Sequence, residues 1–408
     1  MSLLNDQSSV VIVGAGLAGW RLAEALRTES FTGTITIVGD ETHLPYDRPP
    51  LSKQVLSGKW DLTRTTLVRD DSPVAQGVTW RLGARAVEFD AREREVTLDD
   101  GTVLHATHVA IATGSRARPM PYRAADTLHS IRSRDDLERL LVDLESVETQ
   151  RPWVVIGAGF LGAEVATSLK TRGVASIVIE VAHAPLEGVV GALAASWLRS
   201  LPEDYGVALR TDEKIRDVEW RSEVLTVSLE GGEDIEAAGV VVCVGSQLDL
   251  AWLEGSGLEL DGGVVVDEHL QASANVAALG DVARFTWPGP LGPESLRLEH
   301  WEVAVFHAAQ LARYWTQGVG PERAMVPYFW SDQYGKKIQM LGHPRPDDEV
   351  TLVHGDLASK QWLALYARDE IVTGLLALSS PRSLMLAKVV LDEVTSRDHA
   401  VERAPWRA

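Results

Sequence analysis

The sequence has a single cysteine, Cys243, among 408 residues. One thiol per chain excludes an intrachain disulfide framework, a cysteine-ligated zinc cluster and an iron–sulfur cluster held within the chain. We therefore expect no metal site.

Long apolar runs are absent, and basic residues are outnumbered by acidic ones. No run approaches the roughly 18 apolar residues that span a bilayer. Met1 to Ser9 has neither a basic nor an apolar segment, so we expect no signal peptide. The 39 Lys and Arg residues against 58 Asp and Glu residues give a net charge of −19, which argues against nucleic acid and anionic membranes as partners. These features predict a cytoplasmic protein.

The length and composition are those of a globular protein with more than one domain. At 408 residues the chain is too long for one ordinary core, so two or three domains are expected. Its 45% hydrophobic and 24% charged residues are typical of globular domains.

The first forty residues contain the pattern of a dinucleotide-binding βαβ unit. A β-branched run at Val10–Val13 leads into Gly14-Ala15-Gly16-Leu17-Ala18-Gly19, followed by a helical pattern. A second β-type run, Thr34–Val38, ends at Gly39-Asp40-Glu41. In such a unit the glycines permit a tight turn, an approach of backbone to a pyrophosphate and close packing of helix on strand. Asp40 can accept hydrogen bonds from ribose hydroxyls.

The same pattern recurs in the middle of the chain. Trp153–Ile156 leads into Gly157-Ala158-Gly159-Phe160-Leu161-Gly162, and the next strand, Ala175–Ile179, ends at Glu180. Two complete fingerprints indicate two dinucleotide sites on one chain. The alternative is a duplicated domain that has lost its ligand, but the glycines and the terminal acid are present in both copies.

Glu180 favours NADH over NADPH. A carboxylate at this position accepts hydrogen bonds from both ribose hydroxyls and repels a 2′-phosphate. Val181, Ala182 and Ala184 follow, with no arginine to bind such a phosphate, and we interpret His183 as a surface residue.

Three further segments carry candidate site residues. The proline-rich loop from Leu44 to Lys53 can hold Arg48 and Lys53 near a cofactor, although a solvated basic loop is the alternative. Asp281, after Gly280, can bond a polyol hydroxyl or serve as a helix N-cap. Helix is predicted over 302–314, and its N-terminus can stabilise negative charge on a reduced flavin.

The composition changes again at Val326. An aromatic cluster at 328–334 precedes β-type segments at 337–341, 350–354, 362–367 and 371–378, which predict a β-rich end domain. Ser380 and Pro381 predict the start of a last helix.

These motifs resemble the FAD- and NADH-dependent ferredoxin reductases that serve bacterial oxygenases, within the glutathione-reductase structural superfamily. The most specific stretches are 44–53, 157–164, 279–283 and 329–333. The resemblance implies an α/β protein with two Rossmann-like dinucleotide-binding domains and a C-terminal α+β domain. It implies an FAD domain at 1–118 and 249–325, an NADH domain at 119–248 and a C-terminal interface domain at 326–408.

The resemblance also implies roles for individual residues. Lys53 paired with Glu164, and Trp330 between flavin and docked ferredoxin, are the implied catalytic residues. The implied cofactor contacts, apart from Lys53, are Gly14, Ala15, Gly16, Ala18, Gly19, Asp40, Glu41, Arg48, Ala86, Ala112, Thr113, Gly114, Arg132, Gly157, Gly159, Phe160, Leu161, Gly162, Glu180, Gly245, Gly280, Asp281, Glu299, His300 and Trp301.

The sequence departs from the family pattern at three places. Gln247-Leu248-Asp249 stands where Pro-Asn is common, Glu187-Gly188 stands where an arginine is common, and the region of Asp204-Tyr205-Gly206 lacks a common histidine.

The implied function is NADH-dependent reduction of an iron–sulfur ferredoxin through non-covalent FAD. The ferredoxin in turn supplies a terminal oxygenase such as a cytochrome P450. The protein would act as a monomer or weak dimer. The single cysteine excludes the disulfide-reductase branch, which needs a cysteine pair. The alternatives are an NADH oxidase, a rubredoxin or monodehydroascorbate reductase, and an apoptosis-inducing-factor-like interaction flavoprotein.

Overall fold

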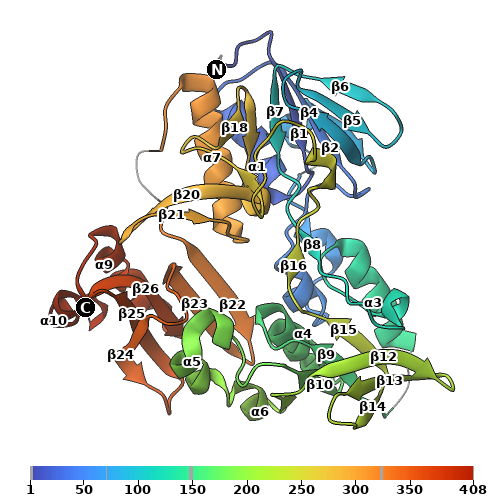
Figure 1. Ribbon diagram of the computed structural model, residues 1–408, viewed down its shortest axis with the longest axis vertical. Helices are drawn as coiled ribbons and strands as arrows, with labels where there is room; N and C mark the ends of the chain where they lie inside the picture. Colours follow the sequence, from blue (N-terminus) through green and yellow to red (C-terminus); the bar gives the residue numbers. More distant parts are fainter. Residues whose placement is uncertain (1–2, 70, 147–149, 322–324, 408) are drawn as a thin grey trace. The chain divides into compact units, whose positions relative to one another are not determined.

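The computed structural model describes residues 3–69, 71–146, 150–321 and 325–407 (Figure 1). The chain forms two compact units. Unit 1 comprises Met1–Asp47, Thr66–Arg116 and Gln247–Pro327, and unit 2 comprises Arg48–Thr65, Ala117–Ser246 and Tyr328–Ala408. The three-domain boundaries expected from the sequence stay a prediction.

The centre of unit 1, as far as it is described, is a six-stranded sheet in the order β18-β19-β7-β1-β2-β3. All neighbouring strands are parallel except β18 and β19. Val10–Val13 is buried on both faces, which explains its unbroken apolar run. The strands are β1 (Ser9–Val13), β2 (Thr34–Gly39), β3 (Val78–Leu82), β7 (His108–Ile111), β18 (Gln271–Ser273) and β19 (Val276–Ala278).

Two long helices, α1 (Leu17–Thr28) and α7 (Trp301–Gln317), pack side by side in unit 1 (Figure 1). Both contribute to the core around the large sheet, with Trp20 and Trp315 fully buried. The remaining elements are α2 (Pro73–Gln76), the antiparallel sheet of β4 (Ala86–Asp90), β5 (Glu95–Leu98) and β6 (Val103–His105), and the sheet of β17 (Val264–Val265), β20 (Ala283–Gly289) and β21 (Gly292–Leu296). The two-residue strands β8 (Arg116–Ala117) and β16 (Ser246–Gln247) stand where the chain passes from one unit to the other.

Unit 2 contains a second parallel sheet, in the order β11-β10-β9-β15. Its strands are β9 (Trp153–Ile156), β10 (Ser176–Ile179), β11 (Ala208–Arg210) and β15 (Gly239–Val242). The helices of this part are α3 (Arg134–Ser146), α4 (Phe160–Thr171), α5 (Glu187–Leu198) and α6 (Leu201–Tyr205).

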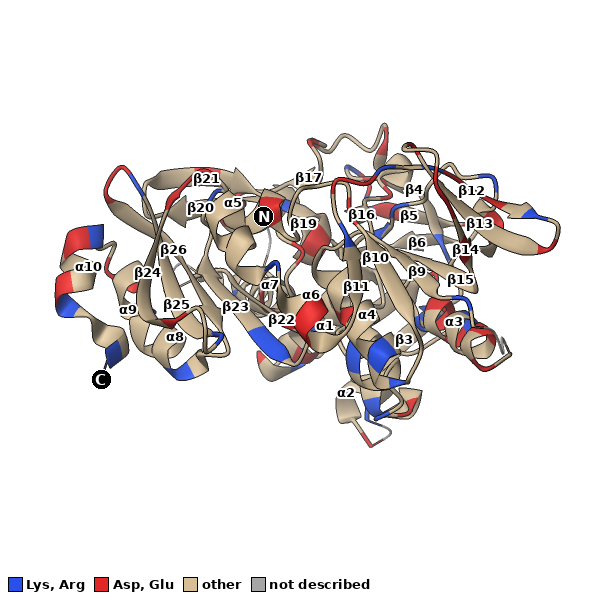
Figure 2. Cartoon of the chain, turned by 90° about the horizontal axis from the view of Figure 1, so that it is seen from below, with Lys and Arg blue, Asp and Glu red and all other residues tan. Residues whose placement is uncertain are grey.

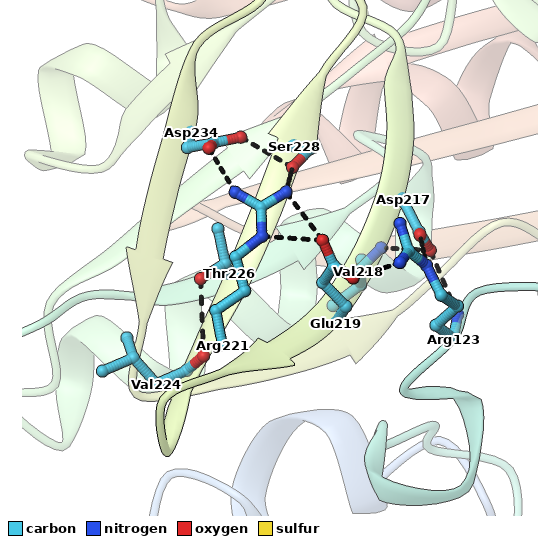
Figure 3. A network of polar contacts seen from close by, with 9 residues as sticks. All are labelled: Arg123, Asp217, Val218, Glu219, Arg221, Val224, Thr226, Ser228 and Asp234. Carbon is cyan, nitrogen blue, oxygen red and sulfur yellow. Dashed lines mark hydrogen bonds and ion pairs between the residues drawn. The ribbon is translucent and has the colours of Figure 1, made fainter.

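A small antiparallel sheet of β12 (Ile215–Arg221), β13 (Val224–Leu229) and β14 (Asp234–Ala237) carries a surface network of charges (Figure 3). Arg221 bonds Glu219, Ser228 and Asp234, and Arg123 pairs with Asp217 and Glu219. Because the Arg123 and Arg221 side chains are 69% and 41% exposed, each pair contributes only about 0–1 kcal/mol, and we assign the network no role beyond supporting this sheet.

The end of the chain forms a five-stranded antiparallel sheet in the order β22-β23-β26-β25-β24. Its strands are β22 (Tyr328–Gln333), β23 (Lys336–Gly342), β24 (Glu349–Asp356), β25 (Gln361–Arg368) and β26 (Ile371–Leu378). Helices α8 (Pro381–Ala387), α9 (Val389–Asp392) and α10 (Arg397–Arg403) pack against β26. Ser380 and Pro381 occupy the N-cap and first positions of α8, as predicted.

The fold class predicted from the sequence is confirmed: two parallel sheets follow glycine turns, and an α+β part ends the chain. The sequence does not reveal one local feature. The segment after the proline-rich loop begins a helix at Leu51, but it is a single π-helical turn, Leu51–Val55, in which Val55 N–H bonds Pro50 C=O at 3.0 Å. Among the described residues, no helix is long and apolar enough to cross a membrane.

Candidate cofactor and redox site

The first glycine turn leaves open space at one glycine and none at the other two. Gly14 has φ +123°, and a Cβ there would lie 2.1 Å from the Ala112 carbonyl oxygen. A Cβ on Gly19 would lie 2.0 Å from the Gly14 oxygen, whereas a Cβ on Gly16 would meet nothing within 4 Å. Gly14 and Gly19 are therefore required for folding, and the space at Gly16 is available to a phosphate at the N-terminus of α1.

The second turn repeats this division. A Cβ on Gly157 would lie 2.7 Å from the Cys243 oxygen, and one on Gly162 would lie 1.9 Å from the Gly157 oxygen. A Cβ on Gly159 would again meet nothing within 4 Å. Both turns therefore have the shape that a dinucleotide diphosphate requires.

Asp40, the acid that directly follows β2, forms an ion pair. Its carboxylate lies 2.6 Å from Arg116 Nη2, and Arg116 Nε lies 3.4 Å from Asp249. Asp249 also pairs with Arg85 at 2.8 Å. Asp249 is one of the departures from the family pattern, and here it anchors the arginine that orients Asp40. The Asp40 and Arg116 side chains are about half-exposed, so the pair positions the carboxylate more than it stabilises the fold.

A second acidic group surrounds Ser115. The Ser115 hydroxyl lies 3.3 Å from Asp281 Oδ2 and 3.1 Å from Glu299 Oε2. Arg297 Nη1 donates to Glu299 Oε1 at 2.7 Å and to the Asp281 carbonyl at 3.0 Å. The sequence predicted Asp281 and Glu299 but missed Ser115 and Arg297. Asp281 lies within the short turn Gly280–Val282, whose N-cap position is held by Leu279, so Asp281 is not an N-cap.

The residues of unit 1 fit an FAD molecule. The Thr113 hydroxyl is buried beside the glycine turn and has no hydrogen-bond partner within the described part of the chain. A buried hydroxyl without a partner is costly, and a ligand oxygen removes that cost. With the space at Gly16 and the carboxylates of Asp40 and Asp281, unit 1 offers partners for a diphosphate and for hydroxyl groups.

The other predicted residues of unit 1 are placed as follows. Glu41 accepts a hydrogen bond from the Tyr46 hydroxyl, and Trp301 Nε1 donates to Asp47 at 2.8 Å. His300 is the N-cap of α7, and Ala86 lies in the hydrophobic core at the start of β4. Gly280 has φ +72°, and its Cβ would lie 3.0 Å from that of Ala18. Gly114 also has a positive φ, 65°, in the loop after β7.

Glu180 braces the second glycine turn. Its Oε2 accepts from Ala158 N–H at 2.6 Å and its Oε1 from Ala182 N–H at 2.9 Å. The neighbouring cation, Arg210, is bound to Glu213 and Glu233, and these bonds raise its pKa above the ordinary value. This pairing leaves Arg210 poorly suited to binding an added phosphate.

Lys53 and Glu164 form a nearly buried ion pair in unit 2. Lys53 Nζ lies 2.6 Å from Glu164 Oε2, and the two side chains are 12% and 7% exposed. Lys53 is presented by the π-helical turn Leu51–Val55 and Glu164 by α4. Turns of this type are rare and frequent at functional sites. The contact expected from the sequence is present, and its role beside a flavin stays a prediction.

Three serines that the sequence analysis missed complete this group. Ser52 Oγ donates to Glu164 Oε2 at 2.7 Å, and Ser331 Oγ donates to Glu164 Oε1 at 2.6 Å. Ser168, one turn after Glu164 on α4, donates to the Ser52 carbonyl at 2.6 Å. Both carboxylate oxygens therefore receive hydrogen bonds, so the buried charge is well satisfied.

Strand β22 presents Trp330 and Ser331 on opposite faces. Phe329 and Ser331 face α4, where Phe329 contacts the ring of Phe160 at a centroid distance of 4.1 Å. Tyr328 and Trp330 share the other face and stack at 5.8 Å. Trp330 is half-buried on a strand that is fixed to α4 by its alternate residues.

Of the remaining predicted residues of unit 2, Arg48 and Arg132 are in contact, and Gly245 and Leu161 lie elsewhere in the unit. Arg48 donates to the carbonyl of Arg132. Gly245 has φ +95°, and its carbonyl accepts from Arg118 N–H at 3.1 Å. Leu161 follows Phe160 in the first turn of α4.

The family model described as pyridine nucleotide-disulphide oxidoreductase matches residues 8–308, and the model described as reductase C-terminal matches 328–405. The chain belongs to the pyridine nucleotide-disulphide oxidoreductase family. The resemblance noted in the sequence is thereby confirmed, and so is the assignment of this protein as an oxidoreductase that uses FAD and NAD(H).

Relatives of this oxidoreductase match it over nearly their whole length. Rhodocoxin reductase of Rhodococcus erythropolis is 33% identical over 94% of this chain and 89% of its own. The ferredoxin–NAD(+) reductase subunit of the benzene 1,2-dioxygenase system of Pseudomonas putida is 31% identical over 94% and 92%. The crystal structure of the covalent putidaredoxin reductase–putidaredoxin complex matches with a TM-score of 0.91 at 27% identity, over 99% of this chain and 98% of that one.

Proposed function

We propose that this protein is an NADH-dependent ferredoxin reductase that delivers electrons to an oxygenase system. One relative is named as the ferredoxin–NAD(+) reductase subunit of a dioxygenase system, and another as a rhodocoxin reductase. A structural neighbour is a putidaredoxin reductase in covalent complex with putidaredoxin. We propose an iron–sulfur ferredoxin as the acceptor and a cytoplasmic monomer or weak dimer as the working form. The net charge of −19 supports the absence of nucleic-acid and membrane partners.

The observation that carries the proposal is that the single cysteine, Cys243, is buried and has no second cysteine to pair with. The family is named for disulfide chemistry, yet Cys243 has no second cysteine to pair with. It is also buried in unit 2, where burial, and less strongly the charge of Glu164, raises its pKa to about 12. Such a thiol is protonated at neutral pH and a poor nucleophile, so the electrons would leave the cofactor without passing through a cysteine of this chain.

The residues of the chain have separate tasks in this scheme. Bound FAD supplies the group that accepts a hydride from NADH and releases electrons one at a time. The Gly157–Gly162 turn and Glu180 bind and orient NADH. Lys53 places a fixed positive charge where negative charge develops on reduction, and Glu164 holds the lysine in place. Trp330 is the proposed exit point toward the acceptor.

The acceptor surface must offset an unfavourable overall field. Ferredoxins are usually acidic, so a chain of net charge −19 needs a local basic region. Basic segments are visible at the β22–β23 turn and near the C-terminal end of α4 (Figure 2). Lys336 and Lys337 follow this turn, and the backbone N–H of Tyr334 bonds Thr167 of α4 at 2.8 Å. Lys337 lies 3.6 Å from Asp332, whereas Lys388, between α8 and α9, forms a closer pair with Asp392 at 2.7 Å.

Two measurements test the proposal. Acid precipitation of the purified yellow protein should release FAD, and flavin retained in the pellet or FMN in the supernatant would contradict it. Cytochrome c reduction by NADH should then depend on added ferredoxin. Equal rates without ferredoxin would favour an oxidase, and reduction of rubredoxin or monodehydroascorbate alone would favour those reductases. NADH binding without turnover would favour an interaction protein.

A further inference from the structure

Helix α7 contains a buried histidine that the scheme above does not use. His307 is 2% exposed, and its Nδ1 lies 3.3 Å from the backbone nitrogen of Gly280. The ring of Phe285 packs edge-on against it at 4.7 Å. Burial lowers the pKa of His307 to about 3, so the ring is neutral at physiological pH and Nδ1 can accept the Gly280 proton.

The turn that His307 holds is sterically demanding. Gly280 has φ +72°, and a Cβ there would come within 3.0 Å of the Ala18 Cβ on α1. The turn therefore lies against the helix that follows the first glycine fingerprint. A backbone N–H buried at such a place needs an acceptor, and the histidine of α7 provides it.

Asp281, the next residue, is fixed from the other side as well. Arg297 donates to its carbonyl at 3.0 Å, and Ser115 lies within hydrogen-bond distance of its carboxylate. The Gly280 amide, the Asp281 carbonyl and the Asp281 side chain thus each have a partner on a different segment. A carboxylate held in this way is oriented before a ligand arrives, which lowers the entropy cost of binding.

We propose that His307 is a positioning residue for the cofactor, which holds the Gly280–Asp281 turn so that the Asp281 carboxylate meets a hydroxyl of the FAD polyol chain. The inference rests on the proposed FAD function and adds a specific requirement to it. The requirement is a hydrogen-bond acceptor at the position of Nδ1, not merely a side chain that fills the core.

Three substitutions separate an acceptor from a space-filling ring. His307→Asn places an amide oxygen close to the Nδ1 position, His307→Gln moves the acceptor further out, and His307→Phe keeps the ring but removes the acceptor. The holoenzyme of each variant is diluted, and FAD release is followed by the recovery of flavin fluorescence to give a dissociation constant. We expect about tenfold weaker FAD binding in the Phe and Gln variants, the order expected for an unpaired buried N–H, and Asn within about threefold of wild type.

A control on the same helix accounts for general loss of stability. Gln310 lies one turn further along α7 and donates to the Glu268 carbonyl at 2.7 Å, away from the Gly280 turn. Gln310→Leu should lower the melting temperature and leave the FAD dissociation constant unchanged.

The outcomes distinguish this inference from the function on which it rests. FAD constants that follow melting temperature across all four variants, or an Asn variant as weak as Phe, would overturn the positioning role. A wild-type protein that holds no FAD would instead overturn the proposed function. If His307→Phe does not fold, the contrast between Asn and Gln still decides the matter.

Discussion

Ser331 Oγ lies 2.6 Å from Glu164 Oε1, although 167 residues separate the two in the chain. The bond joins the strand that carries Trp330 to the helix that carries the partner of Lys53. Because Ser52 and Lys53 occupy the other carboxylate oxygen, Glu164 is held on both sides. The proposed electron exit and the proposed hydride site therefore share one buried carboxylate.

Replacing Lys53 by methionine should slow flavin reduction and destabilise the protein. The variant leaves the buried Glu164 carboxylate without its cation, and breaking such a pair costs about 3–5 kcal/mol. We expect reduction by NADH at least about tenfold slower in stopped-flow, in line with the loss of one preorganised charge.

The double variant Lys53→Met with Glu164→Gln separates the two effects. Removing both charges should restore much of the unfolding free energy while flavin reduction stays slow. A folded Lys53→Met protein reduced at the wild-type rate would show that the pair is only structural.

Ser331→Ala and Ser52→Ala should differ in effect. The first removes the hydrogen bond to Glu164 Oε1, and the second leaves Lys53 on Oε2. We expect Ser331→Ala to cost about 1–3 kcal/mol of unfolding free energy and Ser52→Ala distinctly less. Chemical denaturation of the two holoenzymes measures these losses of unfolding free energy. Equal losses would mean that the hydrogen bond from Ser331 of β22 stabilises the protein no more than the one from Ser52.

Glu180→Ala should change nucleotide preference through charge. The substitution removes the acceptor for the backbone N–H groups of Ala158 and Ala182. The resulting distortion of the turn should weaken the binding of both NADH and NADPH. The substitution removes repulsion only from the 2′-phosphate, so the ratio of NADPH to NADH efficiency should rise by about tenfold or more. A wild-type enzyme that already uses both nucleotides equally would refute this interpretation of Glu180.

Charge reversal at the β22–β23 turn should weaken ferredoxin binding. Lys336→Glu with Lys337→Glu should raise the KM for ferredoxin several-fold at low salt and less at high salt, because exposed charges are screened. Reduction of ferricyanide by NADH should stay unchanged. Lys214→Glu with Arg216→Glu makes the same change in net charge on the small sheet of unit 2 and serves as the control. Trp330→Ala should slow the ferredoxin step with hydride transfer intact.

The buried His307 predicts a pH dependence of stability. Its pKa is lowered to about 3 in the folded protein and is about 6.5 when unfolded, so below pH 6.5 the unfolded chain binds the extra proton. The contribution of His307 to the unfolding free energy is therefore fully present above this pH and is lost on acidification, with a slope approaching about 1.4 kcal/mol per pH unit. Asp267 and Glu268 line the same cavity of about 260 Å³ as His307. Both acids are unchanged in a His307→Asn variant, so their own titration does not contribute to the difference between it and the wild type.

The comparison is between wild type and His307→Asn, unfolded in denaturant with FAD in excess. The two stability curves should diverge in slope between pH 6.5 and 4.5 and run parallel above pH 7.5. His129, whose pKa burial also lowers, is common to both proteins and cancels in the difference. Curves that stay parallel throughout would show that His307 takes up its proton in the folded protein at the same pH as in the unfolded chain, contrary to a lowered pKa.

The fold was predictable because its signals are local. Val10–Val13 and Trp153–Ile156 lead directly into glycine turns, and the acids Asp40 and Glu180 follow the next strands. Each βαβ motif can therefore be recognised within forty residues. The antiparallel end sheet was likewise marked by local β-type segments, of which 362–367 and 371–378 are apolar almost throughout and lie in strands buried along most of their length.

The supporting contacts were not predictable in the same way. Ser115, Ser331 and Arg116 are ordinary polar residues in sequence, and their partners lie between 76 and 184 residues away. Nothing local distinguishes a serine that donates to a buried carboxylate from one that faces solvent. The π-helical turn at Leu51 was missed because its Pro-Pro-Leu start is equally suited to an ordinary helix.

Gly16 and Gly159 have ordinary backbone angles, with φ of −92° and −69°, and no protein atom stands where a methyl group would go. Alanine is therefore compatible with the fold at both positions, in contrast to the other four fingerprint glycines. We therefore expect the two proposed nucleotide sites to be blocked separately, each without loss of folding. Gly16→Ala should give a chain that takes up no flavin, and Gly159→Ala one that holds flavin but does not respond to NADH.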